Sequence, residues 1–259
     1  MQLGRTRRAR YFRALAAILL GFPATWIAAN QARYNFAVLE PGRMYRSGQM
    51  SPGALRRTLH DYHVKTVVNL RGANPREPWY QEEITTTLAA GVTQVDLPLS
   101  SCVWMSRVQL RALVRILDHC DYPVLLHCAW GSERTGLTAA ISQLLRPGSS
   151  LEDARSQLGL RYLYVRAGDG KIMAEFLDQY ERWLAHESLA HGPEVFRRWV
   201  EDSYIPGKPN REEWPYDPFP LFIITRPSPP APAKDARGPS AQKTNGDETG
   251  RRVMEAPTQ

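Results

Sequence analysis

The stretch VLLHCAWGSERTG, residues 124–136, decides how the rest of the chain is interpreted. A short apolar run ends at His127-Cys128, five residues follow, and then comes Arg134 with a Thr-Gly pair. A short, almost wholly apolar run is typical of a central buried strand. The segment from Arg134 onward is typical of a helix. The stretch therefore predicts a strand, a tight loop that begins at Cys128, and a helix.

The predicted loop has the features of an anion site. Backbone N–H groups converge at a helix N-terminus, where the helix dipole is positive. Gly131 and Ser132 let the backbone curl at little steric cost, and Arg134 adds a planar fork that can hold two oxyanion oxygens. These features predict a cradle for a tetrahedral dianion, lined by the backbone from Ala129 to Arg134.

Cys128 would lie at the base of that cradle. The same N–H groups and the helix end lower the pKa of a thiol placed there. A thiolate beneath an oxyanion cradle indicates phosphoryl transfer through a cysteinyl-phosphate, and Thr135 can donate a hydrogen bond to the sulfur. We expect His127 to orient the loop rather than to transfer a proton. A lone cysteine at a strand end is more often a small buried hydrophobe, but the whole string of residues is far rarer.

The rest of the body predicts an α/β fold with a central, mostly parallel sheet flanked by helices. Strands are expected at residues 65–70, 92–99 and 123–127. Strand–helix alternation of this kind favours a sheet that is covered on both faces. The helices are expected at residues 51–62, 80–90, 106–120, 134–145, 150–158, 171–187 and 193–203.

Composition divides the chain into four parts. Residues 1–30 are a candidate N-terminal signal anchor or transmembrane segment, and residues 31–205 form one α/β domain. Residues 206–226 are an extension rich in proline and aromatic residues, which could wrap onto the body. The tail at residues 227–259 consists of Pro, Ala, Ser, Gly and charged residues, so it is predicted to be disordered.

The net charge of +7 lies in the two ends of the chain. Residues 1–13 hold five arginines and no acid, and residues 226–259 hold six basic and four acidic side chains, so residues 14–225 are neutral overall. A nucleic-acid-binding body would need a basic face. Nucleic acid is therefore not an expected partner.

The N-terminal segment favours a membrane. The sixteen residues 14–29 carry no charge, and as a helix they would span about 24 Å against a hydrocarbon core of about 30 Å. An uncleaved anchor is preferred over a cleaved signal peptide, and a buried N-terminal helix of the domain is the least favoured interpretation. In either targeted case the domain would face the periplasm or the exterior.

No metal or cofactor is expected. The six histidines form no convincing ligand cluster, and no Gly-rich nucleotide loop occurs. Cys102 and Cys120 are too few for a disulfide framework, and whether they pair stays open.

The motif HCAWGSERTG resembles the signature loop of the cysteine-dependent protein tyrosine and dual-specificity phosphatases. MYRSGQMSP, TVVNLRGANP and VTQVDLPLS resemble a compact bacterial branch of the dual-specificity group, similar to plant and fungal atypical enzymes, some of which act on inositol pyrophosphates. The resemblance covers about residues 34–186. It implies a phosphatase domain in which Cys128 is the nucleophile and Arg134 binds phosphoryl oxygens. Arg71 faces the same pocket or is a surface arginine.

The general acid of this family is harder to place. Family members carry an aspartate on a loop before the signature strand, and Asp96 is the sole carboxylate in VTQVDLPLSSCVWMS. Asp96 is the first candidate, although it precedes Leu-Pro within a predicted strand. Glu133 is a weaker candidate that would more naturally point outward. Without an acid, an aryl ester or a phosphoanhydride would be a better substrate than an alkyl ester, since a general acid contributes roughly 10²–10⁴-fold.

Several functions stay open. The leading one is a membrane-tethered phosphatase that acts on a phosphorylated protein or a small phosphorylated substrate. Inositol phosphates, inositol pyrophosphates and phosphoinositides are a second group of substrates. A catalytically weak phosphate-recognition module also fits the loop, as do sulfur transfer and arsenate reduction.

Overall fold

The computed structural model describes residues 21, 24–210, 220–227 and 251–253. Their strands form one sheet in the order β1-β2-β5-β3-β4-β6-β7. The four inner strands β2, β5, β3 and β4 are parallel, while β1 and β6 pair antiparallel at the two sides and β7 pairs antiparallel with β6. The strands are β1 Ala37–Glu40, β2 Met44–Ser47, β3 Thr66–Asn69, β4 Thr93–Asp96, β5 Val124–His127, β6 Ile223–Thr225 and β7 Arg251–Val253.

The strand β5 lies inside the sheet, as the apolar run in the opening stretch predicts. All four of its residues are buried, and it pairs with β2 on one side and with β3 on the other. The predicted strands at 65–70, 92–99 and 123–127 are present in shorter form as β3, β4 and β5. β1, β2 and β6 were not predicted.

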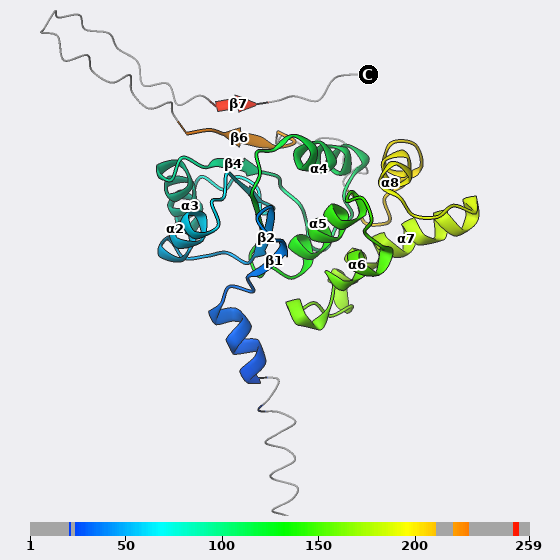
Figure 1. Ribbon diagram of the computed structural model, residues 1–259, viewed down its shortest axis with the longest axis horizontal. Helices are drawn as coiled ribbons and strands as arrows, with labels where there is room; N and C mark the ends of the chain where they lie inside the picture. Colours follow the sequence, from blue (N-terminus) through cyan, green and yellow to red (C-terminus); the bar gives the residue numbers. More distant parts are fainter. Residues whose placement is uncertain (1–20, 22–23, 211–219, 228–250, 254–259) are drawn as a thin grey trace, which may run out of the picture.

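Helices cover both faces of the sheet (Figure 1). α2 and α3 lie on one side, and α4, α5 and α7 lie on the other. All seven predicted helices are present, with a π-helical turn at Trp199–Ser203 that continues the last one. The helices are α2 Pro52–Asp61, α3 Pro78–Ala89, α4 Arg107–His119, α5 Glu133–Leu144, α6 Leu151–Ser156, α7 Ile172–Glu187 and α8 Pro193–Arg198.

The alternation of side chains along β5 divides the core in two. Leu126 and Cys128 pack into the larger cluster with α4, α5 and α7, while Leu125 packs into the smaller cluster with α2. Because successive strand side chains point to opposite faces, His127 lies on the α2 and α3 face. This division matters below, since it separates Cys128 from the polar residues of the sheet.

The C-terminal extension reaches the sheet. Gly207 lies against the Trp104 ring, and the Trp104 amide donates to the Pro209 carbonyl. After residues 211–219, which lie outside the described residues, the chain adds β6 beside β4. The predicted disordered tail lies mostly outside the described residues, but Arg251–Val253 forms β7, which differs from that expectation.

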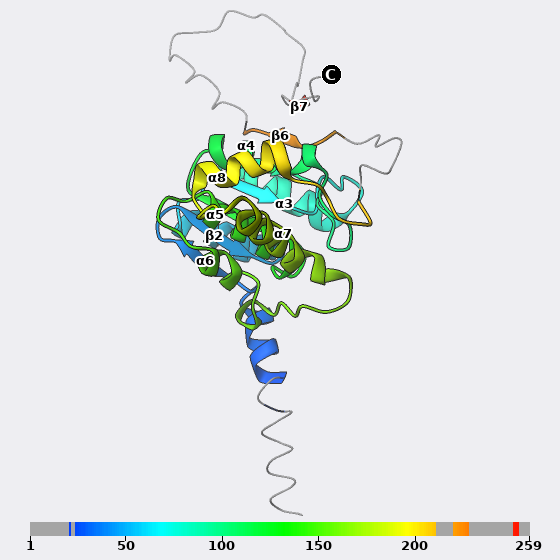
Figure 2. The ribbon, with the colours of Figure 1, turned by 90° about the vertical axis from the view of Figure 1, so that its right-hand side faces the viewer.

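The predicted anchor at residues 1–30 lies largely outside the described residues. Residues 24–32 are helical and project away from the body (Figures 1 and 2). Within the described part of the chain, none of the helices has the length and apolar character needed to cross a bilayer.

Candidate active site

The loop from Cys128 to Arg134 joins β5 to α5 at the carboxyl edge of the parallel strands. Three consecutive carbonyls of this loop accept hydrogen bonds from outside the loop, one from a residue before β1 and two from residues in or just after β2. Because a trans peptide points its N–H away from its C=O, outward carbonyls turn amides inward, where an anion can bind. The bonds run from the Gln49 amide to the Ala129 carbonyl at 3.1 Å, from Asn35 Nδ2 to the Trp130 carbonyl at 3.1 Å, and from Arg46 Nη2 to the Gly131 carbonyl at 2.8 Å.

Gly131 is the residue that lets this loop close on β2. Its φ is +70°, and a Cβ there would lie 2.6 Å from the Gly48 nitrogen and from the Ser47 carbonyl carbon. Any side chain would both strain the backbone and push the loop away from β2. The glycine at the third position of the spacer is therefore a steric requirement.

The N-terminus of α5, like those of α3, α7 and α8, lacks the side-chain cap that α2, α4 and α6 have. Ser106 and Gln109 form a reciprocal capping box at the start of α4, with both bonds at 3.1 Å. At α5 the cap residue Ser132 makes no such bond. Since the first amides of a helix need acceptors, those of α5 are left for a bound anion, as expected for an oxyanion cradle.

The Cys128 thiol has the electrostatics of a nucleophile. It is 3% exposed, and burial raises its pKa. The Thr135 hydroxyl, the Arg134 charge and the amides of Thr135 and Gly131 outweigh burial, so the pKa of Cys128 is lowered. The predicted neighbours of the sulfur are therefore brought together around it.

Arg71 joins Arg134 beside the cradle. Burial and then the positive charge of Arg134 lower the pKa of Arg71, while the charges of Glu83 and Cys128 raise it. Its guanidinium lies 3.4 Å from the centre of the Trp79 ring, and Nη1 donates to Gln49 Oε1 at 2.9 Å. The structure therefore places the half-buried Arg71 close enough to Arg134 and Cys128 for their charges to act on it. Arg134 itself donates to the Leu99 carbonyl at 3.4 Å.

Arg46 is a site residue that the sequence analysis missed. It is fully buried behind the loop on β2, and burial lowers its pKa to about 10. Besides the Gly131 carbonyl, it donates to the Gln157 carbonyl at 2.9 Å and Oε1 at 3.1 Å, and it stacks 3.7 Å from the Tyr162 ring centre. The available signal was an arginine that directly follows Met44 and Tyr45 in MYRS.

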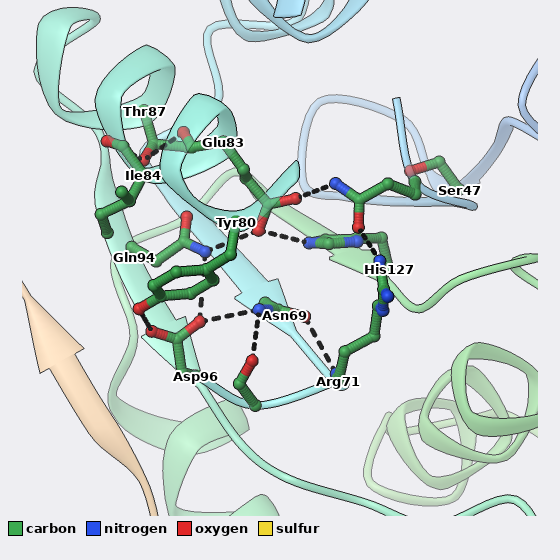
Figure 3. A network of polar contacts seen from close by, with 12 residues as sticks. Ser47, Asn69, Arg71, Tyr80, Glu83, Ile84, Thr87, Gln94, Asp96 and His127 are labelled. Carbon is green, nitrogen blue, oxygen red and sulfur yellow. Dashed lines mark hydrogen bonds and ion pairs between the residues drawn. The ribbon is translucent and has the colours of Figure 1, made fainter. Parts of the chain in front are cut away.

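Asp96 does not reach the cradle, because it lies among Asn69, Tyr80 and Gln94 (Figure 3). It is the last residue of β4, is 1% exposed, and lies on the α3 face with Gln94. Cys128 packs on the opposite face, and β3 separates β4 from β5. The placement argues against the predicted general acid role, because a buried carboxylate behind the sheet has no path to a leaving oxygen.

The Asp96 carboxylate is instead held by three donors. Tyr80 Oη lies 2.6 Å from Oδ2, and Asn69 Nδ2 and Gln94 Nε2 lie 2.8 Å and 3.2 Å from Oδ1. Burial raises the pKa of Asp96, although these hydrogen bonds oppose it. Asp96 thus belongs to a buried polar network.

His127 and Glu83 form the other half of this network (Figure 3). His127 Nε2 lies 3.2 Å from Glu83 Oε1, and both side chains are almost fully buried. Burial raises the pKa of Glu83, but the charge and hydrogen bond of His127 and the hydrogen bonds of the glutamines outweigh burial, so the pKa of Glu83 is lowered. Burial lowers the pKa of His127, but the charge and hydrogen bond of Glu83 outweigh burial, so the pKa of His127 is raised. Gln94 and Gln49 also donate to Glu83. The partner that orients His127 is therefore Glu83, which the sequence analysis did not identify.

Two loop side chains, Trp130 and Glu133, point away from the sulfur. Trp130 is 65% exposed, and the backbone of Gly170 packs against the Glu133 carboxylate, since a Cβ there would lie 2.5 Å from Oε1. Glu133 therefore points away from the sulfur toward the α6–α7 connection. Among the described residues, no group of acidic, histidine and cysteine side chains could hold a metal ion.

The chain is similar to known proteins in its sequence and fold. Residues 30–146 match the model of a family described as the tyrosine phosphatase family. Curated proteins provide no match. Solved structures with a similar fold include the core catalytic domain of the PP-IP phosphatase SIW14 from S. cerevisiae, with 22% identity, a TM-score of 0.44, and coverage of 60% of this chain and 93% of that one. TpbA from P. aeruginosa shows 22% identity, a TM-score of 0.46, and coverage of 57% and 86%.

The matched segment contains β1 to β5, the whole loop and all of α5. The segment that matches the family model therefore includes the complete catalytic loop. By this match, residues 30–146 resemble the tyrosine phosphatase family, and together with the loop the match identifies a cysteine-dependent phosphatase.

Proposed function

We propose that this phosphatase hydrolyses phosphate monoesters of the phosphotyrosine or dual-specificity type through a cysteinyl-phosphate on Cys128. One observation carries the proposal: a buried thiol with a lowered pKa lies where Arg134 and the inward amides of the loop converge. These donors would stabilise the charge on the equatorial oxygens of the transferred phosphoryl group. Arg71 would add a second cation to the pocket.

The reaction has two displacements. The Cys128 thiolate forms an S–P bond as the P–O bond to the leaving group breaks, and the leaving oxygen takes the electron pair. Water then attacks phosphorus, loses a proton to solvent, and the S–P bond breaks to return the thiolate. Thr135, whose hydroxyl lowers the pKa of Cys128, would assist this departure.

The leaving group in the first displacement decides the preferred substrate. Asp96 lies behind the sheet, and the segment Pro98–Met105 beside the pocket contains no carboxylate. Without a proton donor, leaving groups of low pKa are favoured. Aryl phosphates are therefore preferred over alkyl phosphates.

A second substrate class, inositol phosphates, inositol pyrophosphates and phosphoinositides, is favoured by a separate observation. Arg71 and Arg134 lie close enough for the charge of Arg134 to lower the pKa of Arg71, and a pair of neighbouring cations suits a substrate with more than one phosphate. A phosphoanhydride also needs no general acid.

The test is phosphate release by the purified full chain from aryl phosphates of graded leaving-group pKa, an alkyl phosphate, phosphopeptides, phosphoinositides and an inositol pyrophosphate. We expect release that disappears in Cys128→Ser and falls steeply as the leaving-group pKa rises. A flat dependence would show that an acid assists. Retained vanadate binding without release from any substrate would favour the phosphate-recognition module instead.

We also propose that the apolar run at residues 14–29 anchors the chain in a membrane, with the catalytic domain facing the periplasm or exterior. Five arginines on its N-terminal side and an uncharged run support this orientation. Resistance of the full chain to alkaline extraction, together with protease access from outside, would be the expected result. Release of a shortened soluble chain would favour signal cleavage.

A further inference from the structure

Exposed apolar side chains gather at one side of the catalytic loop. Among the described residues, eight large hydrophobic side chains are exposed, and five of them line one open hollow. Large exposed apolar patches mark interaction surfaces, whereas single exposed residues do not. The five are Trp26, Ile27, Trp130, Leu160 and Val165, and the half-buried Leu163 completes the hollow.

The hollow borders the catalytic loop. Trp130, Ser132 and Glu133 belong to the catalytic loop and line it. Trp130 is the second residue after Cys128, so whatever covers the hollow contacts the outer side of the catalytic loop.

The N-terminal segment is fastened to the same place. Asn35 is 2% exposed, and its Nδ2 donates to the Trp130 carbonyl at 3.1 Å and to the Tyr162 carbonyl at 2.9 Å. In both ribbon views the N-terminal helical residues leave the body beside the chain between α6 and α7 (Figures 1 and 2). Residues 24–32 therefore lie on the side of the molecule that carries the hollow.

We propose that this hollow is a membrane-docking surface, with a lipid bilayer as its occupant. Tryptophan rings favour the membrane–water interface, and Leu160, Leu163 and Val165 would insert beside Trp26 and Trp130. Arg33 and Arg161 are exposed on the two segments that form the hollow, and they fit anionic headgroups. Docking would hold the cradle against the lipid surface and favour phosphate esters carried in the bilayer. This inference rests on the proposed phosphatase function.

The test uses the full chain reconstituted in vesicles that contain anionic lipids and brominated acyl chains, which quench nearby tryptophan. The Trp130 contribution is the emission difference between the wild type and Trp130→Phe. We expect brominated lipids to quench this Trp130 emission. The double variant Leu160→Ser/Val165→Ser, altered at positions that are 73% and 61% exposed, should reduce the quenching strongly. In the double variant, the Trp130 emission is again obtained by comparison with the same variant carrying Trp130→Phe.

The matched control is Val108→Ser/Ile205→Ser, at positions 46% and 68% exposed and outside the hollow. It should leave the quenching unchanged. A second readout compares hydrolysis of a vesicle-borne phospholipid monoester with that of a soluble aryl phosphate. Leu160→Ser/Val165→Ser should lower the first rate roughly tenfold, which corresponds to about 1.4 kcal/mol of docking energy, and leave the second unchanged.

Trp130 emission that brominated lipids do not quench would overturn the proposal, as would wild-type rates on vesicles in the double variant. A dimer in detergent that Leu160→Ser/Val165→Ser dissociates would assign the hollow to a second copy of the chain. The quenching does not depend on turnover. Failure of the phosphatase function would instead appear as an absence of Cys128-dependent release from the soluble ester.

Discussion

The two faces of the sheet use the same carboxyl edge in opposite ways. On the α3 face, Glu83 and Asp96 are buried, and each carboxylate is matched by several donors (Figure 3). On the α5 face, the hydroxyl of Thr135, two amides and the charge of Arg134 all act on one thiol. The adjacent residues His127 and Cys128, at the end of β5, lie on opposite faces: His127 on the α3 face and Cys128 on the α5 face. A balanced buried network stabilises the fold, whereas converging donors around a single sulfur favour binding of an anion.

The largest expected effect is on turnover, from a change at the thiol on the α5 face. Cys128→Ser should lower turnover on the order of 10⁴-fold or more, because the nucleophile is lost while the cradle remains. Steady-state phosphate release measures this. Cys120→Ser is the matched control, since burial raises the pKa of Cys120 to about 11 and leaves it a neutral thiol. A comparable loss in the control would contradict the assignment of the nucleophile.

Arg134→Lys tests the geometry of the cradle and should have the second-largest effect. A lysine keeps the charge but loses the planar fork, so kcat should fall by about 10²–10³-fold, as when one preorganised transition-state donor is removed. Arg111→Lys, an exchange in an arginine that pairs with Glu201 on the surface, should leave kcat unchanged. If Arg134→Lys were as active as the wild type, the planar guanidinium group of Arg134 would not be needed for catalysis.

Glu83→Gln acts on the other face and should mainly reduce stability. Breaking a buried ion pair by removal of one charge costs about 3–5 kcal/mol. Chemical unfolding of Glu83→Gln measures this loss, with the neighbouring exposed residue changed in Glu82→Gln as control. An unchanged unfolding free energy would contradict a stabilising role for the pair.

The same variant should also change how stability depends on pH. Because the pKa of Glu83 is lowered from 4.5, its contribution is present above that pH and is lost as pH falls through the lowered value. Because the pKa of His127 is raised from 6.5, its contribution is present below that pH and is lost as pH rises through the raised value. Both contributions should disappear together in Glu83→Gln.

Asp96→Asn should have the smallest effect on catalysis. It tests whether the α3 face contributes to stability alone. The new NH2 group would face either the Tyr80 hydroxyl or the donors of Asn69 and Gln94, so at least one hydrogen bond to the carboxylate is lost and the free energy of unfolding should fall by about 1–3 kcal/mol. The ratio of aryl to alkyl phosphate turnover should stay unchanged. A steep loss for alkyl phosphates alone would show that Asp96 donates a proton and that the network opens during turnover.

The sequence by itself determined the local part of this site. Cys128, Gly131, Arg134 and Thr135 belong to one strand, one loop and one helix, so their spacing is enough to place them around an anion. The predicted order of strands and helices held for the same reason, since it rests on short-range periodicity. The outward position of Glu133 was also expected.

Only the tertiary structure decided which distant residues support that loop. Arg46 binds the carbonyl of a residue 85 positions away, and Glu83 pairs with His127 across 44 positions. Such pairs depend on strand order, which local patterns do not specify. Asp96 shows the limit most clearly. Its distance along the chain suits a general acid, but strand side chains alternate with a period of two residues, and the register of β4 turns the carboxylate to the face opposite Cys128.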